Sequence, residues 1–214
     1  MSFAQTAEHR RSIHNFLPME ITDAQIQEMV RIAALSPSGY NAQPWEFVFY
    51  RDREKIKDLH QLCMSQDQVL ESSAVCVVVG DKNIVKDPDQ LVSDWAEYGY
   101  IDEEYGKHWK PKMRMERPDW KTREMVIRNA ALACMSLMYA ADDMGIANCP
   151  MMGVRQMGLR KWMDLPEDKM PVMVIVMGKE DTEKTLERLP RKSVNELLHL
   201  EEYNSSVIFS NQLS

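Results

Sequence analysis

The pattern of hydrophobic and polar positions predicts two long amphipathic helices. After Thr22, which opens a capping box, apolar residues recur every three or four positions, as on the buried stripe of a helix. This helix is expected to end near Ser36, because Pro37 disfavours helical geometry in the residue before it. A longer helix is predicted over about 122–144, where Gly145 can take the left-handed position that follows a helix.

Three short apolar runs predict strands, at 46–50, 74–80 and 171–178. The run at 74–80 is uniformly apolar, so it is expected to be covered on both faces. Segments 3–11 and 53–62 have helical character. Strands that are separated by helices predict a mixed domain, with helices on the faces of one central sheet.

One segment, 84–121, shows neither the hydrophobic period of a helix nor that of a strand. It is dense in aromatic and charged residues, and we expect an insertion or lid there rather than a core element. A chain of 214 residues predicts a single domain, placed at 1–204. The remaining 205–214 are expected to form a tail that is frayed or packs onto another chain.

Charge and composition exclude several classes of function. A net charge of −7 disfavours general attraction to nucleic acid or to an anionic membrane surface. No apolar run has the length of a membrane-spanning helix, and the first residues lack an apolar leader segment, so a cytoplasmic location is expected. The four cysteines are expected to be buried free thiols, and the dispersed histidines predict no metal site.

Two basic segments are candidates for binding an anion. Arg10, Arg11 and Ser12 follow the first helix, and Arg191 lies after the last strand. Guanidinium groups bind phosphate through paired hydrogen bonds, and a hydroxyl adds a donor, so the two segments could converge on one phosphate. The alternative is that they are ordinary solvated surface. Dinucleotide-binding and P-loop glycine motifs are absent.

Two further segments could contact a ligand. The loop SPSGYNAQPW, at 36–45, combines rigid turn residues with hydroxyl and amide side chains, which suits a flat heterocycle; a plain helix-to-strand connection is the alternative. The segment NCPMMG, at 148–153, ends in Gly153, where the backbone can approach a ligand closely.

Together and in this order, these segments resemble the FMN-dependent nitroreductase family, and within it the Bacillus-type NAD(P)H nitroreductases. The resemblance spans Arg10 to about Leu198. It is carried by RRSIHNF, SPSGYNAQPWEFV, SSAVCVVVGDK, RNAALACMSLMYAADDMGIANCPMMGV and PRKSVNELL.

The resemblance implies an α+β fold, with a nitroreductase-like mixed central sheet flanked by helices, in an interlocked homodimer. It implies one FMN at each of two sites made by both chains. NADH or NADPH would donate hydride, and a small electron-poor acceptor such as a nitroaromatic or a quinone would then react in a ping-pong sequence. No catalytic side chain is implied, because the flavin carries the chemistry.

The resemblance also implies roles for individual residues. The FMN phosphate and ribityl chain would be held by Arg10, Arg11, Ser12 and Arg191; the partner subunit would bring Pro37, Ser38 and Asn41 to the ring, with Gln43 close by; and Pro150, Met152 and Gly153 would lie along its other side. Gln66 is a further candidate for the pyrimidine edge. Two positions depart from the family pattern, since Met152 stands where some relatives carry Glu and Ser193 where Pro is common.

Two other functions remain open at this point. Segment 84–121 could be a dedicated lid, as in the deiodinase-like or flavin-consuming branches that act on one narrow substrate. The chain could also be a non-catalytic flavin-binding protein.

Overall fold

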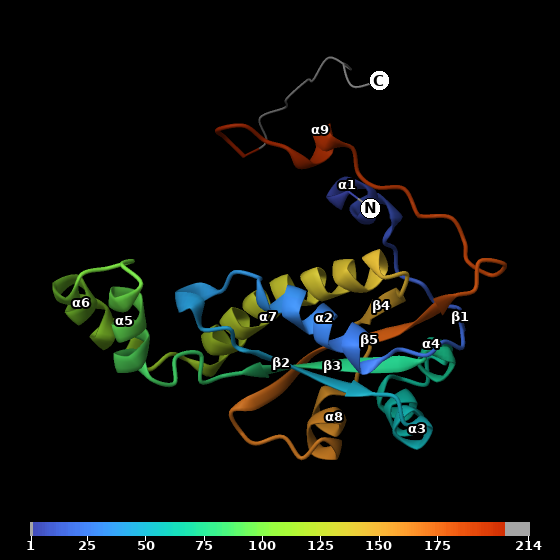
Figure 1. Cartoon of the computed structure of the whole chain (residues 1–214), viewed down its shortest axis with the longest axis horizontal. Helices are drawn as coiled ribbons and strands as arrows, with labels where there is room; N and C mark the ends of the chain where they lie inside the picture. The colour runs from blue at the N-terminus through green and yellow to red at the C-terminus, as the bar shows by residue number, and fades with distance from the viewer. Residues whose placement is uncertain (1, 204–214) are drawn as a thin grey trace.

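The computed structural model describes residues 2–203, and within them five strands form one sheet with helices on both faces (Figure 1). The predicted tail at 205–214 lies outside the described residues. The strands are β1 (Phe16–Leu17), β2 (Trp45–Tyr50), β3 (Ala74–Asp81), β4 (Ala147–Met151) and β5 (Lys169–Glu180). β5 pairs antiparallel with β1, β3 and β4, and β2 pairs antiparallel with β3.

Two layers of helices cover the sheet. The helices of the described part are α1 (Phe3–His9), α2 (Asp23–Ala34), α3 (Arg53–Leu62), α4 (Asp67–Glu71), α5 (Pro88–Glu97), α6 (Glu103–Arg114), α7 (Asp119–Asp143), α8 (Gln156–Trp162) and α9 (Val194–Leu197), with a 3₁₀ turn at Gly39–Asn41. α2 and α7 pack on one face, and α3 and α8 on the other (Figure 1). This arrangement confirms the expected α+β fold. None of the helices among the described residues is long and apolar enough to cross a membrane.

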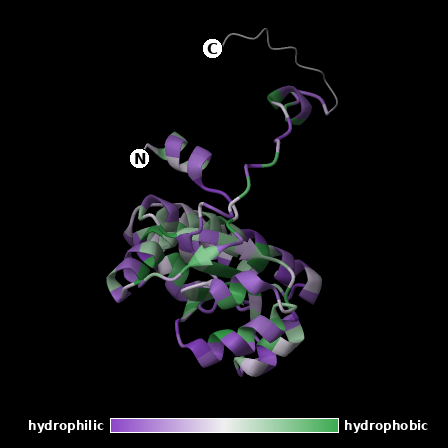
Figure 2. Ribbon diagram, turned by 90° about the vertical axis from the view of Figure 1, so that its right-hand side faces the viewer, coloured by the Kyte–Doolittle hydropathy of each residue, from purple (hydrophilic) through white to green (hydrophobic). Residues whose placement is uncertain are grey.

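The two ends of the described chain leave the body side by side (Figure 2). α1 is held to α7 by an edge-to-face contact between Phe3 and Tyr139 and by His9, whose Nδ1 lies 2.9 Å from Asp142 Oδ2. After β5, residues 182–203 form a C-terminal arm, which Arg188 joins to α1 by donating to the Arg10 carbonyl. Much of this arm is exposed in a single chain.

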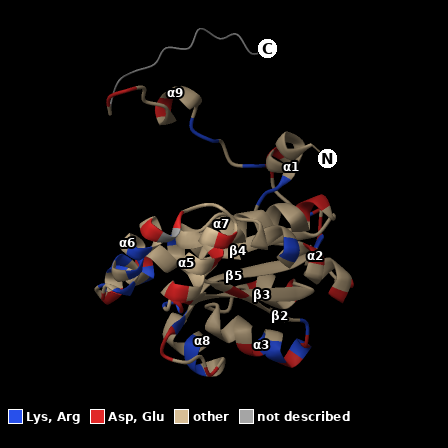
Figure 3. Cartoon of the chain, turned by 60° about the vertical axis from the view of Figure 1, so that its left-hand side comes forward, with Lys and Arg blue, Asp and Glu red and all other residues tan. Residues whose placement is uncertain are grey.

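The segment expected as an insertion is a helical hairpin made of α5 and α6. Gly106 lets the two helices approach, because a side chain there would meet Val92. Asp89 of α5 forms ion pairs with Lys110 and Arg114 of α6. The hairpin lies beside one end of the sheet and is rich in charged residues (Figures 1 and 3). The structure has two regular helices here, where the lack of a clear hydrophobic period predicted an irregular segment.

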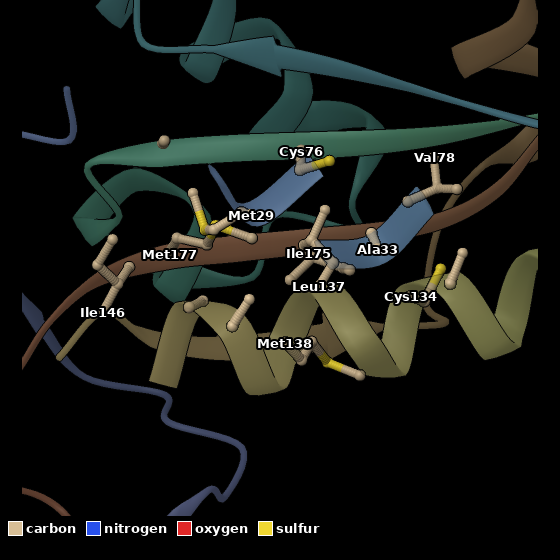
Figure 4. Close-up of a cluster of buried hydrophobic side chains, with 14 of the residues drawn as sticks. Met29, Ala33, Cys76, Val78, Cys134, Leu137, Met138, Ile146, Ile175 and Met177 are labelled. Carbon is tan, nitrogen blue, oxygen red and sulfur yellow. The ribbon is translucent and has the colours of Figure 1, made fainter. Parts of the chain in front are cut away.

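The larger core lies between the sheet and the α2–α7 layer (Figure 4). It is built from alternating residues of β3 and β5 on one side and from the inner faces of both helices on the other. Because the opposite side chains of β3 enter a second core under α3 and α8, the whole strand is buried, as its uniform apolar character predicted. All four cysteines are free and buried, as expected, and burial raises the pKa of Cys134 to about 12.

The predicted helices and strands are confirmed at all the strongly periodic segments. Thr22 forms the expected capping box of α2, and Gly145 has a φ of +73° after α7. β4 was missed, because ANCPM contains Asn148 and Pro150 and looks like a loop. It is a strand only because β5 offers an open edge. The short elements β1, α4, α8 and α9 were also not predicted.

Candidate functional site

Three side chains of the segment after α1 meet one thiol of β4. The backbone of Ser12 pairs with that of Asn148 in an isolated β-bridge, and the His14 Nε2 lies 3.9 Å from the Cys149 sulfur. Burial raises the pKa of Cys149, while a hydrogen bond from Ser12 and the charge of Arg10 oppose that rise. Side chains alternate between the two faces of an extended segment, so those of Arg10, Ser12 and His14 are on the same face.

Arg10 has an unused hydrogen-bond donor. Its Nη1 is buried and has no partner among the described residues. Buried polar atoms are nearly always paired, since an unpaired one costs free energy. Arg11 differs, because it donates to Glu180 at 3.0 Å and to the carbonyl of Leu186 at 3.1 Å. Of the two arginines, Arg10 is therefore the one with a donor free for an anion.

The two basic segments that the sequence singled out border one groove. This groove, of about 620 Å³, runs between the segment after α1 and the first part of the C-terminal arm. Arg11, Ser12 and Arg191 line it, whereas Arg10 is not among its lining residues. The structure therefore brings three of the four predicted residues to one groove. Its guanidinium and hydroxyl donors are the groups that bind phosphate.

Two lining residues were missed by the sequence reasoning. His14 lies in the groove, and its spacing of two and four residues from Ser12 and Arg10 was a signal that could have found it. Arg188 also lines the groove and donates to carbonyls at the end of α1. No motif marked it, because its role depends on the path of the arm.

The loop that joins α2 to β2 presents polar side chains outward. Tyr40, Asn41 and Gln43 all have positive φ, between 44° and 61°. The turn is held by the Ser38 hydroxyl, which accepts from the Gln43 amide at 2.9 Å, and by the Gly39 amide, which donates to a side chain of α7. Pro37, Asn41 and Gln43 are exposed, so they are available to another molecule.

A third group of predicted residues gathers around Gly153, just after β4. The Gln66 side chain donates to the Gly153 carbonyl at 3.2 Å, which brings the pyrimidine-edge candidate to this strand end. A side chain at Gly153 would lie 3.0 Å from that amide, so glycine allows the approach. Met152 is 91% exposed, and Pro150 is half-buried in β4.

One chain does not bring all three groups together. The tip of the loop, at Gly39, contacts α7 at Asn129, whereas α1 contacts this helix at Asp142, thirteen residues further along. At 1.5 Å per residue, the two contacts are about 20 Å apart on the same helix. The residues around Arg10 and those around Gly153 both lie along β4, whereas the tip of the loop lies near the other end of α7.

Comparison with known proteins identifies the fold. The model of the Nitroreductase family matches residues 7–179. The chain belongs to the nitroreductase family. A Bacillus subtilis relative named "Putative NAD(P)H nitroreductase MhqN" is 31% identical over 200 residues, which are 92% of this chain and 97% of that protein.

Solved structures of nitroreductases agree with this assignment. The crystal structure of a "putative nitroreductase ydfN" from Bacillus subtilis has a TM-score of 0.84 at 31% identity, and covers 92% of this chain and 97% of that one. A structure from Exiguobacterium sibiricum, described as a nitroreductase in complex with FMN, has a TM-score of 0.81 at 25% identity, with 93% and 97% covered. The expected nitroreductase family and enzyme class, an oxidoreductase of nitroreductase type, are confirmed, and the expected cofactor FMN with NAD(P)H as donor agrees with them.

Proposed function

We propose that this nitroreductase binds FMN and uses NAD(P)H to reduce small electron-poor acceptors, such as quinones or nitroaromatics, in a ping-pong sequence. One observation carries the proposal. The buried Arg10 Nη1 has no partner among the described residues, and Arg10 directly precedes Arg11 and Ser12, which line a groove together with Arg191. An anionic group that is held there would satisfy this donor.

The donor set fits the phosphate of FMN. Arg10 and Arg191 would supply guanidinium donors, and Ser12 a hydroxyl. Arg11 would contribute charge while it remains bonded to Glu180. Pro150, Met152 and Gly153 would lie along the ring, and Gln66, whose amide is already fixed against Gly153, would meet its pyrimidine edge.

When bound, FMN supplies the two-electron chemistry, since it can accept hydride from one substrate and give it to the next. The residues of the chain bind, orient and shield. Backbone N–H groups around Gly153, where the chain is held by Gln66, would stabilise negative charge at the ring by being fixed before reaction. No acid–base side chain is assigned.

The same proposal requires two chains. The loop of Pro37, Ser38, Asn41 and Gln43 lies about 20 Å along α7 from the Arg10 region, so it would serve the site of a partner. α1 and the C-terminal arm leave the body (Figure 2). The arm exposes large apolar side chains, such as Leu186, at 85%, and Leu189, at 77%. Exposed apolar surface of this kind is typical of an interface between subunits.

The first test is the visible spectrum of the purified protein, after reconstitution with FMN and removal of unbound flavin. We expect a flavin spectrum with one FMN per chain, and bleaching by NADH or NADPH without oxygen. Retention of no flavin would refute the proposal. Oxidation of bleached protein by a panel of quinones and nitroaromatics then separates the alternatives. Fast oxidation by many acceptors supports a general reductase, oxidation by one supports a narrow-substrate branch, and oxidation by none supports a flavin-binding protein.

A further inference from the structure

The α5–α6 hairpin is divided sharply by charge. Residues 87–106 contain seven Asp and Glu and no Lys or Arg, whereas residues 107–114 contain four Lys and Arg and no Asp or Glu. The net charge of the whole chain is −7, but the second half of α6 carries a local excess of positive charge (Figure 3). Such a surface attracts anions over short distances.

Most of these cations are already paired with carboxylates. Lys110 lies 2.9 Å from Asp89, Arg114 is bonded to the same carboxylate, and Lys107 lies 3.1 Å from Glu104. Each of these three cations therefore has a carboxylate partner within the hairpin, with Asp89 shared by two of them.

Lys112 is different. Its ammonium group lies 2.7 Å from the His108 Nε2 and 5.0 Å from the centre of the Trp109 ring, and it has no carboxylate partner among the described residues. At 2.7 Å from an ammonium donor, His108 accepts a hydrogen bond as the neutral imidazole. Both side chains are exposed. An arriving anion would meet an ammonium group that has no carboxylate partner and lies beside the His108 ring.

This pair lies close to the loop that we assign to the flavin ring. The ring centre of Trp109 is 6.1 Å from that of Tyr40, and Tyr40 directly precedes Asn41 in the loop. Tyr40 also stacks on Trp95 of α5 at 6.4 Å. Lys112 is therefore joined to the loop through its contact with the Trp109 ring and the contact of that ring with Tyr40.

The groove on the other side of α5 is unsuited to phosphate. It has a volume of about 320 Å³ and lies between the loop and α5, and its lining includes Asp87 and Asp94. Its one lysine, Lys86, is paired with Asp81, which also lines the groove. Neither Asp87 nor Asp94 has a Lys or Arg partner among the ion pairs of the described residues, and each would repel a phosphate group. A dinucleotide that approaches the loop would therefore place its phosphates toward α6.

We propose that Lys112 and His108 bind the adenosine 2′-phosphate of NADPH, so that the enzyme prefers NADPH to NADH as hydride donor. This inference rests on the proposed function, because it assigns a donor to the same site. NADPH differs from NADH by that one phosphate group, so a single unbalanced ammonium can discriminate between the two.

The test uses the FMN-loaded enzyme and two matched variants. Lys112→Met keeps the apolar stem against the Trp109 ring and removes the charge. Lys107→Met removes a charge from the same helix that is already balanced by Glu104. KM and kcat are measured for both donors with one quinone, and the binding of 2′,5′-ADP is measured by calorimetry as a readout that needs no turnover.

We expect the wild type to have a lower KM for NADPH than for NADH. Lys112→Met should raise the KM for NADPH roughly tenfold, weaken 2′,5′-ADP binding by a similar factor, and leave kcat and the KM for NADH within about twofold. Lys107→Met should change none of these values by more than about twofold.

Two results would overturn the inference: a wild type that does not prefer NADPH, or a Lys112→Met variant that affects both donors equally or neither. In both cases turnover with NADH would leave the proposed function standing. An FMN-loaded wild type that oxidises neither donor would instead refute the proposed function.

Discussion

At the scale of single residues, the proposed phosphate site depends on Arg10, Ser12 and Arg191. The sequence predicted all three, because paired arginines beside a hydroxyl have a recognisable chemistry. The sequence could not show that Arg11 would bond to Glu180 while Arg10 kept a free donor. This difference between the two arginines depends on which side chain of the segment after α1 points toward β5, and the structure is needed to show that.

Replacing Arg191 with alanine tests the phosphate assignment. Arg191→Ala should weaken FMN binding by about 1.5–3 kcal/mol, the range for a hydrogen bond to a charged group. The measurement is a fluorescence titration of apoprotein with FMN. Arg31→Ala is the control, because Arg31 pairs with Glu28 on the exposed side of α2 and does not line the groove. An unchanged dissociation constant would remove Arg191 from the phosphate site.

At the scale of elements, the long periodic helices and the apolar strands followed from the sequence, but β4 and the hairpin did not. α2 and α7 have a period that burial on one side dictates. β4 contains Pro150 and becomes a strand through its pairing with β5. The hairpin helices are amphipathic but bury few side chains, chiefly Val92 and Met113, so few apolar positions mark them in the sequence. Local sequence predicts elements poorly where pairing or ion pairs define them.

A network of ion pairs joins three strand ends near the base of the hairpin. Lys169 of β5 donates to Asp81 of β3 at 2.9 Å and is bonded to Glu46 of β2, and Lys86 lies 2.8 Å from Asp81. Burial by itself would raise the pKa of Asp81, but the hydrogen bonds from Lys86 and Lys169 hold it below its ordinary value of 3.8. Asp81 is therefore ionised at neutral pH.

Asp81→Asn should lower the free energy of unfolding at pH 7 by about 1–3 kcal/mol, because it leaves Lys169 with less compensation. A carboxylate whose pKa is lowered by folding stabilises the fold above its unfolded pKa. This contribution is lost as the pH falls through the lowered value, below 3.8. Urea unfolding at pH 7 and pH 3 measures it: the difference between wild type and variant should shrink at pH 3. An equal difference at both pH values would contradict the role of the Asp81 charge.

The hairpin is expected to act as a lid through its contact with the loop. Trp95→Ala removes the ring that stacks on Tyr40, and should change the ratio of kcat/KM between quinones and nitroaromatics while FMN stays bound. Tyr98→Ala is the control, since Tyr98 belongs to the same hairpin and is 78% exposed. If the rings only anchor the hairpin, Trp95→Ala should lower thermal stability and leave the acceptor ratios unchanged.

At the scale of the whole molecule, the proposed FMN site requires a dimer. The family resemblance in the sequence implied a shared site, and the fold gives a physical reason for it in the distance between the loop and the groove along α7. We expect a buried interface above ~2,000 Å², of the obligate class, so that dilution does not yield folded monomer. Sedimentation across a wide range of concentration measures this. A folded monomer loaded with FMN would contradict the assembly.

The central claim is that each FMN site combines the Arg10 groove of one chain with the loop of its partner. It is tested by co-expressing two defective chains with different tags, one carrying Arg10→Ala and the other Ser38→Ala with Asn41→Ala. In the purified heterodimer, one site would carry both defects and the other none. We predict one FMN per heterodimer, bound with wild-type affinity, although each parent homodimer binds FMN weakly. A heterodimer whose sites bind FMN no better than those of the parents would show that the groove and the loop do not meet across the interface.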